Sequence, residues 1–331
     1  MEWSGWNHSE FDKVARQLSR TDPDAEEICI HAEGLRALPD ELWEFERLRK
    51  LDIHSDCLEE IPAGIGRLTH LRSLELTCAP IATLPPEIGP LADLRELVVS
   101  NGTLTHLPPE IGELSRLRKM SFCSSPLKEL PSEIGGLSDL EVLDAPAARL
   151  TAIPPEVGRL RALVELRLSS DDVGDEGGEG VTLPNELWEL SRLEKLELTD
   201  FWAEELPRGI GSLRSLRRLD LSSLYLSAHD WRAELPADLW DLTGLEVLRL
   251  PGSGLSALPP AIGRMRRLRH LELNGCDVRE LPPEMARLTL LETLDLSGSR
   301  VETVGEEIRS LPRLRSLTTS RRRASRPRQD C

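Results

Sequence analysis

The sequence predicts a single solenoid of the α/β class, in which parallel strands stack side by side and short helices or turns back them. Two observations lead to this fold class. Prolines recur at intervals of 23 residues along most of the chain, and two apolar residues, two positions apart, precede each of them. A fixed period of this length is typical of one supersecondary unit that is repeated many times. The recurring prolines are Pro39, Pro62, Pro85, Pro108, Pro131, Pro154, Pro184, Pro207, Pro236, Pro259 and Pro282.

Each repeat is expected to open with a short strand. Apolar residues alternate with polar ones there, and a period of two is typical of a strand that buries one face. Leu196 and Leu198, for example, alternate with charged residues. The same pattern recurs from Ile28 to Leu317, which predicts about thirteen parallel strands.

A short helix or turn is expected after each proline, because proline lacks a backbone N–H and fixes φ, which suits the first turn of a helix. Most repeats carry an acidic residue two positions later, where a carboxylate faces the unpaired N–H groups of the helix start. We interpret these acids as structural. They are Glu41, Glu87, Glu110, Glu133, Glu156, Glu186, Asp238, Glu284 and Glu307. Tryptophan replaces the glycine of this turn at Trp43, Trp188 and Trp240, which we interpret as cover for the stack.

The repeat LPxEIGxLxxLxxLxL resembles the leucine-rich repeat family in its 23-residue intracellular form, over residues 25 to about 319. This resemblance implies a right-handed horseshoe with strands on the concave face and short helices and turns on the convex face. The family usually carries asparagine three residues after the second strand leucine, but this chain does not. The backbone there is expected to find other partners. The residues in that slot are Asp56, Ala79, Gly102, Ser125, Ala148, Ser253, Cys276 and Ser299.

We expect three segments along the chain. Residues 1–24 form an N-terminal helical cap, because apolar residues recur there at helical spacing. Residues 25–319 form the solenoid, with insertions near 171–180 and 224–233. Residues 320–331 are basic and are expected to be a disordered tail.

Composition narrows the class of protein and its location. The formal net charge of −16 makes nucleic acid a poor partner. Neither a membrane-spanning apolar stretch nor a Sec-type signal peptide is expected. The six scattered cysteines favour a reducing, cytoplasmic setting. Scarce lysine beside abundant arginine suggests a bacterial source, so the chain is expected in a bacterial cytoplasm or in a host cell reached by a non-Sec route.

Catalysis and cofactor binding are not expected, because the sequence has no glycine-rich phosphate loop, no nucleophile elbow and no CxxC pair. We therefore predict that the protein is not an enzyme and holds no cofactor. Cys29, His31, Asp52 and His54 are metal-type ligands on one exposed face of neighbouring strands. Exposed strand positions are also commonly polar, so no metal site is predicted and the question stays open.

The two longest repeats mark the expected binding site. The proline spacing grows to 30 residues before Pro184 and to 29 before Pro236, and insertions of this kind often lie on the binding face. Aromatic residues gather there, either as interface anchors or as a core for the insertions. The predicted partner-binding residues are Phe201, Trp202, Tyr225, Trp231, Arg167, Lys195, Glu197, Arg218, Asp220 and Arg249.

These observations and the family resemblance predict a non-catalytic recognition protein, an adaptor, inhibitor or sensor, that binds a protein partner on its concave face and insertion rim. No small-molecule substrate, nucleic acid or membrane is expected as a partner, and the chain is expected to be a monomer. As an alternative, the resemblance allows the substrate-recognition half of a bacterial effector-type ubiquitin ligase whose catalytic part is absent from this chain.

Overall fold

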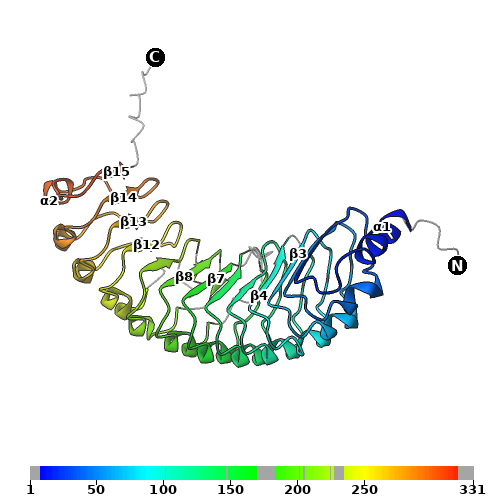
Figure 1. Ribbon diagram of the computed structural model, residues 1–331. Helices are drawn as coiled ribbons and strands as arrows, with labels where there is room; N and C mark the ends of the chain where they lie inside the picture. Colours follow the sequence, from blue (N-terminus) through cyan, green and yellow to red (C-terminus); the bar gives the residue numbers. More distant parts are fainter. Residues whose placement is uncertain are drawn as a thin grey trace, which may run out of the picture.

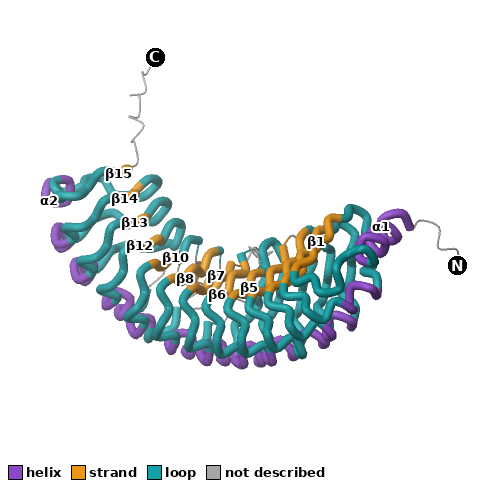
Figure 2. The backbone as a smooth tube through the Cα atoms, viewed as in Figure 1, coloured by secondary structure: helices purple, strands orange, loops and turns teal. Residues whose placement is uncertain are grey.

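The backbone winds into an open, curved solenoid with strands on the inner face and short helical turns on the outer face (Figures 1 and 2). It is seen in a computed structural model that describes residues 8–100, 102–146, 148–169, 183–200, 202–203, 206–223, 225–226 and 235–319. The predicted fold class is confirmed.

Thirteen parallel strands form one sheet, and their order in the sheet follows the chain. The register pairs equivalent residues of successive repeats, as in Leu51 opposite Leu74, because each repeat returns the chain to the same edge of the sheet. The strands are β1 (Glu27–His31), β2 (Lys50–His54), β3 (Ser73–Thr77), β4 (Glu96–Ser100), β5 (Lys119–Ser121), β6 (Val142–Ala145), β7 (Glu165–Ser169), β8 (Lys195–Thr199), β10 (Arg218–Asp220), β12 (Val247–Arg249), β13 (His270–Glu272), β14 (Thr293–Leu296) and β15 (Ser316–Thr319).

Short 3-10 helices build most of the outer face. All except η8 (Ile210–Ser212) start directly after the recurring proline, which is extended, whereas η8 starts after Gly209, which has a positive φ of 113°. One turn is all that fits before the chain must go back to the sheet, and short lengths favour the 3-10 form. They are η1 (Asp40–Glu44), η2 (Ala63–Arg67), η3 (Pro86–Ile88), η4 (Pro109–Glu113), η5 (Ser132–Gly136), η6 (Pro155–Arg159), η7 (Asn185–Glu189), η8 (Ile210–Ser212), η9 (Ala237–Asp241), η10 (Pro260–Arg264) and η11 (Pro283–Arg287).

Two α-helices lie near the ends of the stack in the part of the chain that the structure describes. The first, α1 (His8–Leu18), packs Val14 and Leu18 into the continuous apolar core, and the second is α2 (Glu306–Arg309). No helix in the described part of the chain combines the length and apolar character needed to cross a bilayer.

The core is one column of leucines that runs through all the repeats. Leu51, Leu97, Leu196 and Leu219 are each fully buried, as are their equivalents in the other central repeats. Since every repeat buries its leucines against its two neighbours, stability is shared along the stack.

The three turn tryptophans are buried, with 4% of Trp43, 5% of Trp188 and 3% of Trp240 exposed, so their interpretation as cover is confirmed. The repeat after each tryptophan lacks the usual acid. A Cβ atom at Gly64 would overlap the indole of Trp43, and one at Gly209 would lie 3.0 Å from the Cδ1 atom of Trp188. The indole of Trp43 therefore leaves no room for a side chain at position 64, and at Gly209 the positive φ of 113° favours glycine as well. After Trp240 the equivalent residue is Ala261.

Asp238, one of the acidic residues of the turns, contacts the preceding repeat instead of the N–H groups of its own helix. Its carboxylate accepts hydrogen bonds from the N–H groups of Gly209 (2.8 Å) and Gly211 (3.0 Å), which belong to the preceding repeat. Both hydrogen bonds that this carboxylate makes with described residues go to that repeat and not to its own turn, η9. This acid joins two repeats.

Other polar groups replace the asparagine of the family pattern. Asp56 accepts a hydrogen bond from the N–H group of Gly34 at 2.6 Å, and the neighbouring Ser55, which is fully buried, donates to the carbonyl oxygen of Leu35 at 2.9 Å. Near the other end of the stack, the Cys276 thiol donates to the carbonyl oxygen of Leu250 at 3.0 Å. Burial raises the pKa of this thiol, which keeps it protonated and able to donate. The expectation of other partners is correct at these positions.

Candidate functional site

The inner wall of the solenoid is an array of polar side chains held at regular spacing. Neighbouring strands of a parallel sheet lie about 4.8 Å apart, and alternate residues of each strand point to the same face. Six residues predicted from the sequence to bind a partner lie together on four consecutive strands of this wall, β7, β8, β10 and β12. They are Arg167, Lys195, Glu197, Arg218, Asp220 and Arg249.

Arg167 on β7 is the centre of the first group of ion pairs. Its guanidinium lies 3.4 Å from Asp144, 3.2 Å from Glu165 and 3.4 Å from Glu197, measured between the nearest nitrogen and oxygen atoms. Lys195 adds a second cation, with its Nζ atom 2.8 Å from Glu197. The pairs cross three strands, so they hold the side chains of this part of the wall in place.

Asp144 is the most buried carboxylate of this group, with 15% of its side chain exposed. Burial raises its pKa, an effect that the nearby guanidinium of Arg167 only partly offsets. Its Oδ1 atom is buried without a hydrogen-bond partner among the described residues. The folded protein therefore binds a proton at Asp144 more tightly than the unfolded chain does.

We expect Asp144→Asn to raise the melting temperature at pH 7. The raised pKa means that ionised Asp144 costs stability above its folded pKa, and that this cost disappears as the pH falls below the unfolded value, about 3.9. The difference between variant and wild type should therefore shrink as the pH is lowered, which thermal unfolding from pH 7 to 3.5 measures. A constant difference would contradict the assignment to Asp144 ionisation.

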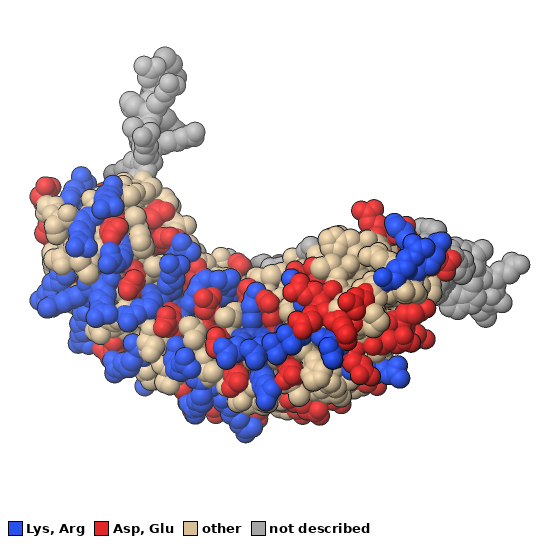
Figure 3. Space-filling view, in the orientation of Figure 1, with Lys and Arg blue, Asp and Glu red and all other residues tan. Residues whose placement is uncertain are grey.

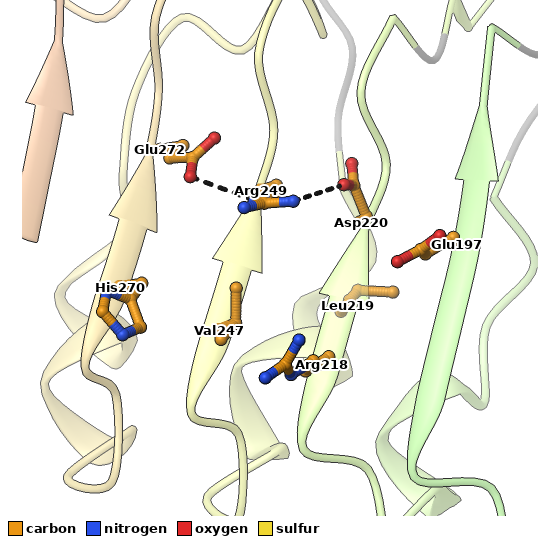
Figure 4. A pocket seen from close by; sticks show the side chains of 8 residues that line it. All are labelled: Glu197, Arg218, Leu219, Asp220, Val247, Arg249, His270 and Glu272. Atoms are coloured by element: carbon orange, nitrogen blue, oxygen red, sulfur yellow. Dashed lines mark hydrogen bonds and ion pairs between the residues drawn. The ribbon is translucent and has the colours of Figure 1, made fainter. Parts of the chain in front are cut away.

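Arg249 on β12 is the centre of a second group. Its Nε lies 3.0 Å from Glu272 and its Nη1 lies 3.5 Å from Asp220, so it bridges β13 and β10 (Figure 4). Partial burial opposes the charged form of Arg249, but the two carboxylates outweigh it and raise the pKa. Asp220 also accepts a hydrogen bond from the hydroxyl of Ser222.

A hollow of about 220 Å³ opens in the wall between these ion pairs, over β8, β10, β12 and β13 (Figure 4). Val247 lies between Arg218 on one side and His270 on the other, and Arg249 closes the upper edge. His270 is held by a hydrogen bond of 2.9 Å between its Nδ1 atom and the hydroxyl of Thr293. The sequence-based site omitted Val247 and His270. The sequence carried only a weak signal for them, because Val142 on β6 is also an uncharged residue in register between two charged ones, Lys119 and Glu165.

The aromatic rim is described only in part. β9 (Trp202–Ala203) and β11 (Tyr225–Leu226) pair in parallel as a separate two-stranded sheet, with Trp202 opposite Tyr225. The backbones of these two predicted residues are thus brought together. Phe201 and Trp231 lie outside the described residues, as do the whole of 171–180, most of 224–233 and the tail 320–331.

The possible metal ligands form pairs across β1 and β2. Cys29 is opposite Asp52, and His31 is opposite His54 with their ring centroids 5.8 Å apart. Across the ranges that the structure describes, no group of three or more histidine, cysteine or acidic side chains could hold a metal ion.

Charge is spread unevenly over the molecule. In the view of Figure 3, basic side chains gather over the repeats of β12 to β15, while acidic ones gather toward α1.

The family described as leucine-rich repeat region matches residues 30–124 and, in a second match, residues 109–223. This chain belongs to the leucine-rich repeat family. The leucine-rich repeat fold is a scaffold for protein–protein interaction, and members of the family are typically non-catalytic binding modules.

Several solved leucine-rich repeat structures are similar over most of this chain. A leucine-rich repeat protein of Leptospira interrogans is 25% identical, with 92% of this chain and 98% of that chain covered and a TM-score of 0.50. The ectodomain of the plant membrane receptor kinase GASSHO1/SCHENGEN3 from Arabidopsis thaliana, in complex with CASPARIAN STRIP INTEGRITY FACTOR 2, is 27% identical with a TM-score of 0.72. The match covers 90% of this chain but only 36% of that ectodomain.

An internalin from Listeria monocytogenes shares the fold with a TM-score of 0.74 at 14% identity, over 93% of this chain and 87% of the internalin. A sequence search of curated proteins found no match.

Proposed function

We propose that this protein is a non-catalytic recognition protein that binds a protein partner on the inner wall formed by β7, β8, β10 and β12. The observation that carries the proposal is the pair of ion-pair groups around Arg167 and Arg249. Side chains that are already held by their neighbours lose little entropy when a partner binds. Complementary charges on such a surface favour the correct partner and its orientation.

The shape of the wall supports a macromolecular partner. Small-molecule sites are usually enclosed cavities of about 300–1,000 Å³, whereas the hollow in this wall measures about 220 Å³ and is open. Among the similar structures, the GASSHO1/SCHENGEN3 ectodomain is in complex with CASPARIAN STRIP INTEGRITY FACTOR 2. A protein or peptide along the strands suits this wall better than a buried small ligand.

The setting and role are proposed from composition and family. We infer an adaptor, inhibitor or sensor that acts as a monomer in a bacterial cytoplasm, or in a host cell reached by a non-Sec route. The scattered cysteines and the net charge of −16 support a reducing compartment and a partner other than nucleic acid.

Affinity capture from a lysate, followed by quantitative binding of the captured protein, tests this function. Arg167→Glu reverses the charge at the centre of the wall, so it is expected to weaken binding of the true partner at least about tenfold. Arg267→Glu, an exposed position outside the wall, is the matched control and should bind normally. Equal binding by the two variants would contradict a site on the inner wall.

We expect the double variant with Phe201→Ala and Trp202→Ala to bind the same partner more weakly by roughly 2 kcal/mol or more, because aromatic anchors dominate interface energies. The measurement is calorimetric titration, with thermal unfolding as the control for folding. Normal binding together with a lower melting temperature would instead make these aromatics part of a core for the insertions.

A further inference from the structure

The hollow over Val247 contains one cation that the described residues leave without an ion pair. Each carboxylate around it already has an ion-pair partner: Glu197 pairs with Lys195 at 2.8 Å, while Asp220 and Glu272 share Arg249 at 3.5 and 3.0 Å. Arg218 on β10 lines the same hollow and is exposed. Its guanidinium has no ion pair or hydrogen bond to any residue that the structure describes.

The strand register explains why Arg218 has no ion-pair partner among the described residues. Its neighbours in register are Lys195 on β8 and Val247 on β12. A like charge directly opposite is unfavourable, and valine has no group that can pair with a guanidinium. The cross-strand partners that neutralise the other charges of the wall are therefore missing at this position.

The short side chain of Val247 also creates the space of the hollow. The residues in register with it, Arg218 and His270, carry long or bulky polar side chains, whereas valine is short and apolar. Its methyl groups offer an apolar surface between the guanidinium and the imidazole, as Figure 4 shows. The volume of about 220 Å³ suits one side chain of a partner.

We propose that this hollow is a subsite for a glutamate or aspartate side chain of the protein partner, with its carboxylate on Arg218 and its methylene groups on Val247. This inference rests on the proposed function, because it names the chemistry of one contact on the same wall. Charge-assisted hydrogen bonds between arginine and a carboxylate are among the strongest polar contacts in proteins.

The same geometry disfavours other charges. A lysine or arginine of the partner would face Arg218 directly, and Asp220 and Glu272 are already paired with Arg249, although this one cation leaves them a net negative charge. A phosphorylated side chain carries about two negative charges, and Asp220 and Glu272 at the edge of the hollow repel the second one. Specificity thus comes from repulsion as well as attraction.

A selection of random dodecapeptides displayed on phage tests this subsite, with wild type, Arg218→Ala and Arg267→Ala as targets. Peptides selected on wild type are expected to share one acidic position. Replacing that acid by its amide in a synthetic peptide should weaken binding to wild type at least about tenfold. The loss should vanish in Arg218→Ala and persist in Arg267→Ala, which removes an exposed arginine outside the hollow.

Two further binding measurements test the same subsite. Arg218→Glu should select a basic residue at the shared position, and a phosphoserine in place of the acid should bind wild type more weakly than glutamate does. An amide penalty of equal size in wild type and Arg218→Ala, or stronger binding of the phosphoserine peptide, would overturn the carboxylate subsite.

The result also separates this inference from the proposed function. Selected peptides that lose affinity in Arg167→Glu but share no acidic position would leave the inner wall as the binding surface and refute the subsite. Peptides that are insensitive to both Arg167→Glu and Arg218→Ala, or no selection above background, would refute both.

Discussion

Leu219→Ala is expected to lower the free energy of unfolding by roughly 2–5 kcal/mol, which is the usual cost of truncating a buried leucine in a well-packed core. Leu219 is fully buried in the middle of the stack and lies in register between Leu196 and Leu248. The cavity would open against both neighbouring repeats, which cannot close around it without shifting their own strands. Urea denaturation followed by circular dichroism measures the change.

Arg218→Ala is the matched control, because Arg218 directly precedes Leu219 but is exposed. Its effect on stability should stay within about 0.5 kcal/mol. A loss of less than about 0.5 kcal/mol for Leu219→Ala would mean that the column of leucines does not hold the repeats together. The transition is also expected to broaden if the repeats on either side unfold separately.

Gly112→Ala is expected to destabilise the protein by about 1–3 kcal/mol, the range of overpacking in a core. A Cβ atom at Gly112 would overlap the carbonyl oxygen of Glu133 in the next repeat, which is backbone and cannot rotate away. Both repeats would have to separate on the outer face of the solenoid. Differential scanning calorimetry should show the loss as a lower melting temperature.

Gly244→Ala distinguishes packing from backbone entropy. Its Cβ atom would lie 3.4 Å from the nearest atom, the carbonyl oxygen of Arg214, which is an ordinary contact. Replacing glycine by alanine without a clash usually stabilises by about 0.4–1 kcal/mol, since the unfolded chain becomes less flexible. We therefore expect Gly112→Ala to lower the stability of the protein and Gly244→Ala to raise it. Equal effects would show that the turn glycines are not required by close packing.

The strands and the inner wall could be predicted because one spacing controls both. A leucine pair every 23 residues can be buried only if equivalent residues align, and the alignment then fixes which side chains face inward. The spacing alone thus predicts that Arg167, Glu197 and Arg249 share the inner face of the same sheet, on β7, β8 and β12.

The contacts themselves could not be predicted, because they depend on side-chain conformation and on neighbours that differ between repeats. Arg167 pairs with residues before and after it in the stack, and Arg249 does the same, but nothing in a column of charges says which pair forms. The link from Asp238 to the preceding turn is similar, since the carboxylate could as well have capped its own helix.

One regularity could have been found in the sequence. Trp43 and Trp188 are each followed, one repeat later, by glycine where most repeats carry an acid, at Gly64 and Gly209, and Trp240 is followed by Ala261. The structure shows the reason, since the indole overlaps the place of a side chain at position 64 and lies 3.0 Å from it at position 209. Comparing each repeat with the next, rather than with the average repeat, would have predicted this contact.

The strand register continues unchanged through the two longest repeats, with Glu165 opposite Lys195 and Arg218 opposite Val247. Lengthening a loop from 23 to 30 residues adds only about 0.2 kcal/mol of closure entropy. Selection can therefore change the length and composition of these two loops at little cost to folding. Homologues with different loops would keep every inner-wall residue in place, so binding specificity can diverge while the scaffold stays the same.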